Sequence, residues 1–278
     1  VVDHDLLTQR LGKRRDDGAR ADIGAAGGRE RHDETDRARR PGASPPGSRS
    51  SHRLWSTRDG AGRHARSSGC GKLRIVDRDF VDLSNLQRQV LFDEEDVAQH
   101  LPKAVVAATR LSRINSQVVL EPHVADVDWR SIRDYVQDVD LILDGTDNFE
   151  TRFLVNDVAL ETNIPWVYAG VVGSHGQTMA IFPGRSACLR CVIESPPDPG
   201  TSETCDTAGV IAPAIHMVTS LQAATALKIL SGQQQLVQPQ LTIVDVWEGT
   251  LRQMNLAGLR ERGECPACGP QQRRDWLN

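Results

Sequence analysis

The sequence predicts an α/β fold in which a doubly wound, mostly parallel sheet continues into an antiparallel half. Strand and helix patterns alternate from residue 71 onward, which is the order that builds a parallel sheet with helices on both faces. Acidic residues follow two of the predicted strands, and such sheets bind their ligands at the carboxyl ends of the strands. Two Cys-x-x-Cys pairs lie in the second half of the chain and predict a metal site within this fold.

The hydrophobic period predicts each element in turn. Residues 72–77 read as a short strand that ends in an acid, and residues 101–114 carry apolar side chains at helical spacing after Pro102. The further elements are a strand at 118–121, a helix at 129–136, a buried strand at 139–144, a helix at 150–162, strands at 165–169 and 177–182, a helix at 209–230, and a strand pair at 241–246 and 250–256.

Residues 1–70 have a different composition. They hold fourteen Arg and one Lys against ten acidic residues, a formal charge of +5, whereas the whole chain of 278 residues carries −4. Only eight of these seventy residues are Val, Ile, Leu or Trp, too few to offset the entropy of ordering the segment. We expect a segment of low order without a first strand. The interspersed acids disfavour a nucleic-acid-binding arm, and the Arg, Gly, Ala, Ser and Pro mixture resembles GC-rich DNA translated in the wrong frame.

The whole chain lacks the signals of a membrane or secreted protein. No apolar run approaches the roughly 20 residues that a membrane-spanning helix needs, and the N-terminus has no basic-then-apolar signal pattern. Six cysteines are too few for a disulfide scaffold in a chain of this length. We therefore expect a soluble, cytoplasmic protein.

Three positions early in the ordered part are candidates for nucleotide binding. Asp77 ends a strand, where an acid accepts hydrogen bonds from ribose hydroxyls, although such an acid also serves as a turn former. The stretch 84–89 contains Arg88, whose planar guanidinium suits a phosphate, and the alternative is a solvated polar loop. Lys103 follows Pro102 at a predicted helix start, where an ammonium and helix amides meet a phosphate together.

Asp147 and Asn148 follow the most hydrophobic strand of the chain. Carboxylates in a turn at the end of a buried strand are well placed to bind magnesium beside nucleotide phosphates. The alternative is capping of the helix that follows, and one residue can do both.

The most specific chemical signal is the set Cys188, Cys191, Cys265 and Cys268. Four thiolates satisfy tetrahedral zinc without an open position, so the site would be structural. The 73 residues between the two pairs exceed a compact zinc ribbon, so the metal would clip a distant loop to the C-terminal region. A pair of redox dithiols is the alternative, and it lacks a thioredoxin-like context.

Cys205 stands apart from both pairs. It lies just before a predicted helix, and a helix N-terminus lowers the pKa of a thiol and favours the reactive thiolate. The alternative is a small buried hydrophobic residue.

These motifs occur together in one order, and as a set they resemble a known family. The motifs are Asp77-Arg78-Asp79, Ser84-Asn85-Leu86-Gln87-Arg88-Gln89, Pro102-Lys103, Leu143-Asp144-Gly145-Thr146-Asp147-Asn148, the two cysteine pairs and Thr204-Cys205-Asp206-Thr207-Ala208-Gly209. They are similar to those of the ubiquitin-activating-enzyme-like adenylyltransferases of the ThiF/MoeB/HesA type, which have a Rossmann-like fold. By this resemblance residues 71–278 are the adenylyltransferase domain.

The resemblance implies ATP-dependent adenylation of the C-terminal glycine of a ubiquitin-like sulfur carrier protein, of the ThiS or MoaD type. Asp77 would hold the ribose, Ser84, Asn85, Leu86, Gln87, Arg88 and Lys103 would bind the phosphates, and Asp147 with Asn148 would serve magnesium and ATP. Cys205 matches a cysteine that takes part in later sulfur transfer, which implies a sulfur donor such as a cysteine desulfurase or a rhodanese. The family is usually a homodimer, and neither nucleic acid nor membrane is an expected partner.

One departure from the family pattern leaves alternatives open. The family has a strand, a Gly-rich GxGxxG loop and a helix ahead of residues 72–77, and no such unit is recognisable in residues 1–70. The chain is therefore either an adenylyltransferase whose first unit was mistranslated, or an inactive, non-catalytic relative that binds a carrier. An NAD-dependent oxidoreductase would share the fold and Asp77, but it would need the missing glycines more and the cysteine pairs not at all.

Overall fold

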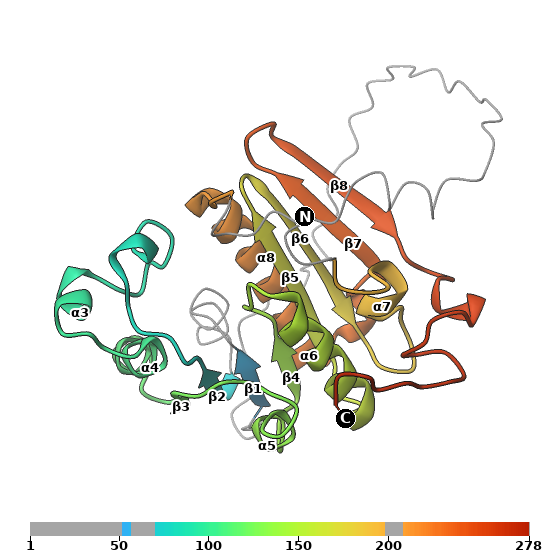
Figure 1. The fold of residues 1–278 in the computed structure, drawn as a ribbon, viewed down its shortest axis with the longest axis horizontal. Coiled ribbons are helices and arrows are strands. Elements are labelled where there is room, and N and C mark those ends of the chain that lie inside the picture. Colours follow the sequence, from blue (N-terminus) through green and yellow to red (C-terminus); the bar gives the residue numbers. More distant parts are fainter. Residues whose placement is uncertain (1–51, 57–69, 198–207, 278) are drawn as a thin grey trace, which may run out of the picture. The chain divides into compact units, whose positions relative to one another are not determined.

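The structure is a computed structural model that describes residues 52–56, 70–197 and 208–277 (Figure 1). These residues belong to one compact unit. Apart from residues 52–56 and Cys70, the segment expected to be of low order lies outside the described residues. Within the described part, no helix is long and apolar enough to cross a membrane.

Eight strands form one sheet in the order β3-β2-β1-β4-β5-β6-β7-β8. The strands are β1 (His52–Ser56), β2 (Cys70–Val76), β3 (Val119–His123), β4 (Leu141–Leu143), β5 (Trp166–Val172), β6 (His175–Ile181), β7 (Gln240–Asp245) and β8 (Thr250–Asn255). Neighbours from β3 to β5 pair in parallel, and neighbours from β5 to β8 pair antiparallel. The predicted parallel sheet with an antiparallel half is confirmed.

Strand β1 corrects the expectation that residues 1–70 contain no strand. It lies between β2 and β4, with Leu54 in register with Leu73 on one side and with Leu141 on the other. The centre of the sheet is therefore filled. Residues 52–56 hold only two adjacent apolar residues, so they have neither a strand period nor a continuous apolar run. Pairing with β2 and β4 stabilises this strand, although its own sequence does not predict one.

The helices connect the strands and cover both faces of the sheet. They are α3 (Glu94–Ala98), α4 (Lys103–Ile114), α5 (Ile132–Tyr135), α6 (Phe149–Thr162), α7 (Leu189–Val192) and α8 (Ala212–Leu230), with short 3-10 turns η1 (Leu83–Asn85), η2 (Gln234–Leu236) and η3 (Arg260–Arg262). Helix α6 lies on one face of the sheet and α8 on the opposite face (Figure 1). The sequence predicted α4, α5, α6 and α8, but it missed α3 and α7.

Local capping residues determine where helix α6 begins and ends. The side chain of Asn148 caps α6 by accepting a hydrogen bond from the backbone N–H of Thr151 at 2.8 Å. Asn163 ends the helix in the left-handed conformation, with a φ of 58°. Beneath α6, the three residues of β4 are fully buried, so this strand is a rigid support for the loop that follows it.

Candidate active site and cysteine cluster

A pocket of about 680 Å³ opens at the carboxyl ends of β2, β3 and β4. Its wall is made by the residues after each of these strands, by part of the turn around η1 and by the first turns of α4 and α6. The lining comprises Val76, Asp77, Arg78, Asp79, Asn85, Arg88, Gln89, Lys103, Ala125, Asp126, Val127, Gly145, Thr146, Asp147, Asn148, Glu150 and Thr151. The pocket has the size of a small-molecule or cofactor site and the place that open α/β sheets use for ligands.

Six of the nine side chains predicted to bind a nucleotide lie together on this wall. They are Asp77, Asn85, Arg88, Lys103, Asp147 and Asn148. The other three belong to the same turn but have other surroundings. The hydroxyl of Ser84 donates to Asp82, Leu86 packs against the hydrophobic core, and Gln87 Nε2 donates to the backbone oxygen of Val210 at 3.1 Å.

Lys103 is held in place before any ligand arrives. Its ammonium is buried and lies 3.2 Å from Oδ2 of Asp79, and its backbone N–H donates to the backbone oxygen of Asp79 at 2.9 Å. The backbone N–H of Asp79 in turn donates to Oδ1 of Asp77 at 2.9 Å. The loop after β2 and the first turn of α4 are thus joined into one rigid wall that carries both an acid and a cation.

Arg88 is fixed more loosely. Its Nη1 donates to the backbone oxygen of Ser84 at 3.0 Å, and the side chain is half-buried. The guanidinium keeps further N–H donors for a ligand, because one backbone oxygen occupies only part of its donor capacity.

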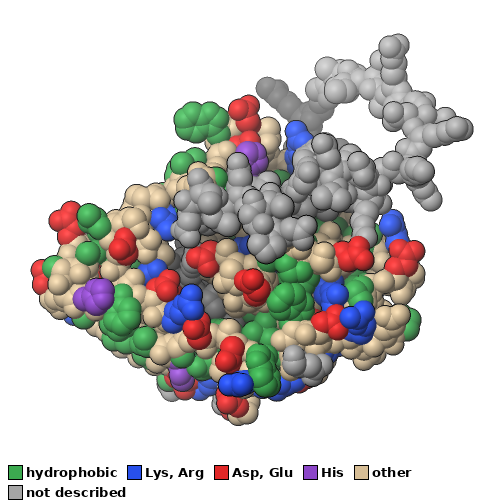
Figure 2. All heavy atoms as spheres, in the orientation of Figure 1, with side chains coloured by type: hydrophobic (Ala, Val, Ile, Leu, Met, Phe, Trp, Pro, Cys, Tyr) green, Lys and Arg blue, Asp and Glu red, His purple; other side chains and the backbone are tan. Residues whose placement is uncertain are grey.

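The pocket lining carries mixed charge with an excess of acid. Five carboxylates (Asp77, Asp79, Asp126, Asp147 and Glu150) face three cations (Arg78, Arg88 and Lys103). Acidic and basic side chains lie close together on the face between α4 and α6 (Figure 2). Such a lining suits a polyphosphate only together with a divalent cation, because the acids alone would repel the phosphates.

A buried polar network supports the loop that carries Asp147. Asp144 accepts hydrogen bonds at 2.8 Å from both the N–H and the hydroxyl of Thr146, and Arg152 Nη2 donates to the backbone oxygen of Thr146 at 2.7 Å. Burial raises the pKa of Asp144, while the Arg152 guanidinium, 3.4 Å away, opposes that rise. From α8, Gln222 Nε2 donates to the backbone oxygens of Asp144 and Val167 at 2.7 and 2.9 Å. Sequence analysis included Asp144 and Thr146 in one motif but missed their links to Arg152 and Gln222, which belong to α6 and α8.

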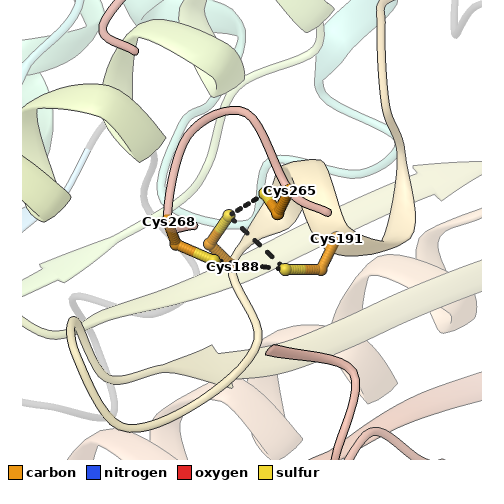
Figure 3. A group of neighbouring side chains, drawn as sticks. All are labelled: Cys188, Cys191, Cys265 and Cys268. Carbon is orange, nitrogen blue, oxygen red and sulfur yellow. Dashed lines mark hydrogen bonds between the residues drawn. The ribbon is translucent and has the colours of Figure 1, made fainter. Parts of the chain in front are cut away.

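The four cysteines predicted to bind metal form one cluster (Figure 3). The Sγ atoms of Cys188 and Cys265 lie 3.6 Å apart, those of Cys191 and Cys268 3.3 Å apart, and all four lie within 4.8 Å of one another. The thiols are free. A tetrahedron of sulfurs about 2.3 Å from a central zinc has edges of about 3.8 Å, so the cluster fits such an ion.

Helix α6 connects the cysteine cluster to the pocket. Asn156 Oδ1 accepts from the backbone N–H of Leu189 at 2.9 Å, and Asp157 Oδ2 accepts from that of Trp276 at 3.1 Å. The ring of Phe153 packs 5.4 Å from that of Trp276, and Arg190 pairs with Asp275 at 2.9 Å. One side of α6 therefore contacts both segments that carry the cysteines, the one around α7 and the C-terminal one, while the first turn of the helix lines the pocket.

Cys205 lies outside the described residues.

Comparison with known proteins gives the following matches. The model of the ThiF family matches residues 65–267. The sulfur carrier protein ThiS adenylyltransferase of Bacillus subtilis is 42% identical over 202 residues, which cover 73% of this chain and 59% of that protein. The sulfur carrier protein adenylyltransferase of Thermus thermophilus is 35% identical over 211 residues, covering 74% of this chain and 76% of that protein.

The crystal structure of Escherichia coli MccB superposes with a TM-score of 0.66 at 22% identity, over 79% of this chain and 66% of that one. At this identity the superposition shows a shared fold. This chain spans about three fifths of the length of the Bacillus relative, so whole-protein properties do not transfer from these matches alone.

Proposed function

Because the chain belongs to the ThiF family, we propose that it is an ATP-dependent adenylyltransferase that activates the C-terminal glycine of a ubiquitin-like sulfur carrier protein. The observation that carries the proposal is the pocket at the ends of β2, β3 and β4, which gathers six of the nine residues predicted for ATP. Names of relatives support the substrate class, since both similar proteins are sulfur carrier adenylyltransferases.

In the proposed reaction, the terminal carboxylate of the carrier attacks the α-phosphorus of ATP. A carboxylate–phosphorus bond forms, the bond from the α-phosphorus to the bridging oxygen breaks, and pyrophosphate leaves with the bond electrons. No general base is required, because the carboxylate is already ionised at neutral pH. Negative charge grows on the leaving pyrophosphate, and Arg88 and Lys103 stabilise it from fixed positions on the pocket wall.

The polar and acidic residues after β2 and β4 orient the nucleotide. Asp77 follows β2, where its carboxylate accepts hydrogen bonds from ribose hydroxyls. Asp147 and Asn148 follow β4 on the facing part of the wall and would hold magnesium, and the acid-rich lining fits that ion. Bound magnesium would neutralise phosphate charge during the transfer. Asn148 already caps α6 through Oδ1, so Asp147 is the residue of this pair with a charge to offer the ion.

We assign zinc to the cysteine cluster as a structural ion. All four positions around the metal would be sulfur, which leaves no place for a substrate. The ion would join the chain around α7 to the C-terminal region and, through α6, steady one wall of the pocket.

Sulfur transfer is a further part of the proposal. The Cys205 thiolate would attack the outer sulfur of a persulfide on the donor, a cysteine desulfurase or rhodanese, and the donor thiol would leave. The Cys205 persulfide would then displace AMP from the carrier adenylate, linking the carrier to Cys205 as an acyl disulfide, and a second thiol would release the carrier thiocarboxylate by disulfide exchange. A homodimer and a cytoplasmic location complete the proposal. The alternative, a carrier-binding relative without catalysis, is not favoured, because β1 fills the centre of the sheet and the pocket retains its cations.

The origin of residues 1–70 stays a separate hypothesis. We propose that most of this segment is translated from the wrong reading frame of a gene for this family. Translation of the first 70 codons in the other two frames tests the idea. A strand, a Gly-rich loop and a helix in one frame would support it, and their absence from both frames would refute it.

The test of the proposed activity is ATP–pyrophosphate exchange by the full chain, with magnesium and a small ubiquitin-like carrier that ends in Gly-Gly. Exchange that requires the terminal glycine of the carrier is the expected result. A folded, metal-loaded protein that binds the carrier without exchange would establish the non-catalytic alternative.

A further inference from the structure

Gln87 lies in the stretch that the family resemblance assigns to phosphate binding, but its side chain is used elsewhere. Its Nε2 donates to the backbone oxygen of Val210 at 3.1 Å, and the two residues are 123 positions apart in the chain. Asn85 and Arg88, on either side of it in the same turn, line the pocket, whereas Gln87 is not part of the lining. The carboxamide of Gln87 therefore joins the phosphate-binding turn to the chain that enters α8.

The turn that carries Gln87 is held together by its own hydrogen bonds. The N–H of Arg88 donates to the backbone oxygen of Asn85 at 3.0 Å, and Nη1 of Arg88 donates to that of Ser84, also at 3.0 Å. The side chain of Leu86 packs against the hydrophobic core. Gln87 thus starts from a backbone whose position is already fixed, and so does Arg88 on the pocket wall.

The acceptor, Val210, belongs to a second fixed segment. It is buried, lies two residues ahead of α8 and forms a bridge with Gly173 in the turn between β5 and β6. The N–H of Gly173 donates to the backbone oxygen of Gly209 at 2.9 Å, and the N–H of Ile211 donates to that of Gly173 at 3.1 Å. Gly173 and Gly209 have φ values of 59° and 70°, a left-handed conformation that favours glycine. We call Gly173 together with residues 209–211 the α8 junction.

Neither segment needs the Gln87 hydrogen bond for its own structure. The turn is held by its internal bonds and the α8 junction by its backbone bonds, so the bond fixes the position of one segment relative to the other. The side chain of Gln87 is exposed, and a single exposed hydrogen bond adds little to the stability of a fold. In contrast, the buried Gln222 joins α8 to β4 and β5 through two bonds from one amide. Gln87 is therefore better explained by positioning than by stability.

The two segments serve the two steps of the proposed reaction. Arg88 of the turn stabilises the leaving pyrophosphate during adenylation, and Cys205, proposed for sulfur transfer, precedes Gly209 by four residues in the chain. A persulfide on Cys205 has to reach the adenylate that forms in the pocket. The chain between Cys205 and α8 must therefore be placed relative to the pocket wall, and the bond from Gln87 to Val210 supplies such a placement.

We infer that Gln87 is a positioning residue for the sulfur-transfer step, which it serves by holding the α8 junction in a fixed place relative to the phosphate-binding turn. The inference rests on the proposed function, from which it takes both steps. It removes Gln87 from the phosphate-binding set that the family resemblance implies. Loss of the carboxamide should therefore slow sulfur delivery and leave adenylation intact.

The experiment compares the two steps in the full, metal-loaded chain carrying Gln87→Leu. ATP–pyrophosphate exchange with a carrier ending in Gly-Gly measures adenylation. Single-turnover formation of the carrier thiocarboxylate from preformed carrier adenylate and a persulfide-loaded donor, followed by mass spectrometry, measures delivery. Exchange should stay within about twofold of wild type, whereas delivery should slow about 3- to 10-fold, the factor that corresponds to the net contribution of one hydrogen bond.

Further variants separate the hydrogen bond from other effects of the substitution. Gln87→Glu keeps the length of the side chain but cannot donate, so it should match Gln87→Leu, whereas Gln87→Lys can donate and should restore delivery to within about twofold of wild type. Gln99→Leu, which removes an exposed glutamine at the end of α3, is the matched control and should change neither rate. Hydrogen exchange at the amides of Gly173 and Ile211 should quicken in Gln87→Leu by about the factor that delivery loses.

Four results would overturn the inference. They are a loss of exchange as large as the loss of delivery, delivery by Gln87→Leu within about twofold of wild type, failure of Gln87→Lys to restore delivery, and unchanged hydrogen exchange at Gly173 and Ile211. A wild-type chain without pyrophosphate exchange would instead overturn the proposed adenylation, and full delivery by Cys205→Ala would overturn the proposed sulfur route. Hydrogen exchange requires neither activity, so it tests the contact of Gln87 in both cases.

Discussion

Removing the zinc proposed for the cysteine cluster should lower the stability of the protein by a calculable amount. Cys188 and Cys265 are 77 residues apart in the chain, as are Cys191 and Cys268, so a bound ion closes a long loop. Closing a loop of this length removes entropy from the unfolded chain equivalent to about 4–5 kcal/mol, a large share of the ~5–15 kcal/mol by which domains are stable. At about 2–4 °C per kcal/mol for a domain of this size, metal removal should lower Tm by about 10–20 °C.

The assay is differential scanning calorimetry before and after chelation, with metal content measured by mass spectrometry. Contacts such as that of Trp276 with α6 do not depend on the ion, so the stripped protein should still unfold cooperatively at its lower Tm. A Cys191→Ser/Cys268→Ser variant is the control, and chelation should not lower its Tm further. A stripped wild-type protein that melts within about 2 °C of the metal-loaded one would refute the loop-closure reasoning.

Three further outcomes follow from the site and the charges. Arg88→Ala should lower the rate of ATP–pyrophosphate exchange about 10²- to 10³-fold, with partial rescue by Arg88→Lys, which keeps the charge but loses the planar fork; an unchanged rate would remove Arg88 from the reaction. Partial burial acts to raise the pKa of Glu121, but the hydrogen bonds and charges of Lys72 and Arg74 prevail and lower it. This carboxylate thus adds stability above its unfolded pKa of about 4.3, and that stability is lost as pH falls through the lower folded value. Urea unfolding between pH 7 and pH 3 should therefore show a smaller acid loss for Glu121→Gln than for wild type, and identical slopes would contradict this. Cys205→Ala should stop sulfur delivery to the carrier in a coupled assay with a sulfur donor; full delivery by this variant would end the proposed role.

The sequence predicted the sheet and the long helices from residue 71 onward because their periods are strong. The apolar run Leu141–Leu143 and apolar residues at helical spacing such as those in α4 specify their structure locally. The strand β1 could not be predicted in this way. Its five residues pair with β2 and three of them also pair with β4, so it depends on tertiary context that the local pattern does not contain.

The candidate site likewise contains some residues that the local sequence could predict and others that only folding brings together. Residues in the loops after strands, such as Asp77 and Asp147, could be placed on one pocket because the carboxyl ends of parallel strands share one edge of the sheet. The support of Asp144 by Arg152 and Gln222 joins α6 and α8 across β4, and only folding brings those groups together.

The central claim is that this chain transfers AMP to the terminal carboxylate of a carrier protein. The most direct measurement is the intact mass of a ubiquitin-like carrier ending in Gly-Gly after incubation with the chain, ATP, magnesium and a pyrophosphatase. The account predicts a carrier species heavier by one adenylate, formed by the complete carrier and absent when its last glycine is deleted. An unmodified carrier, in the presence of a folded chain that binds ATP, would contradict the claim.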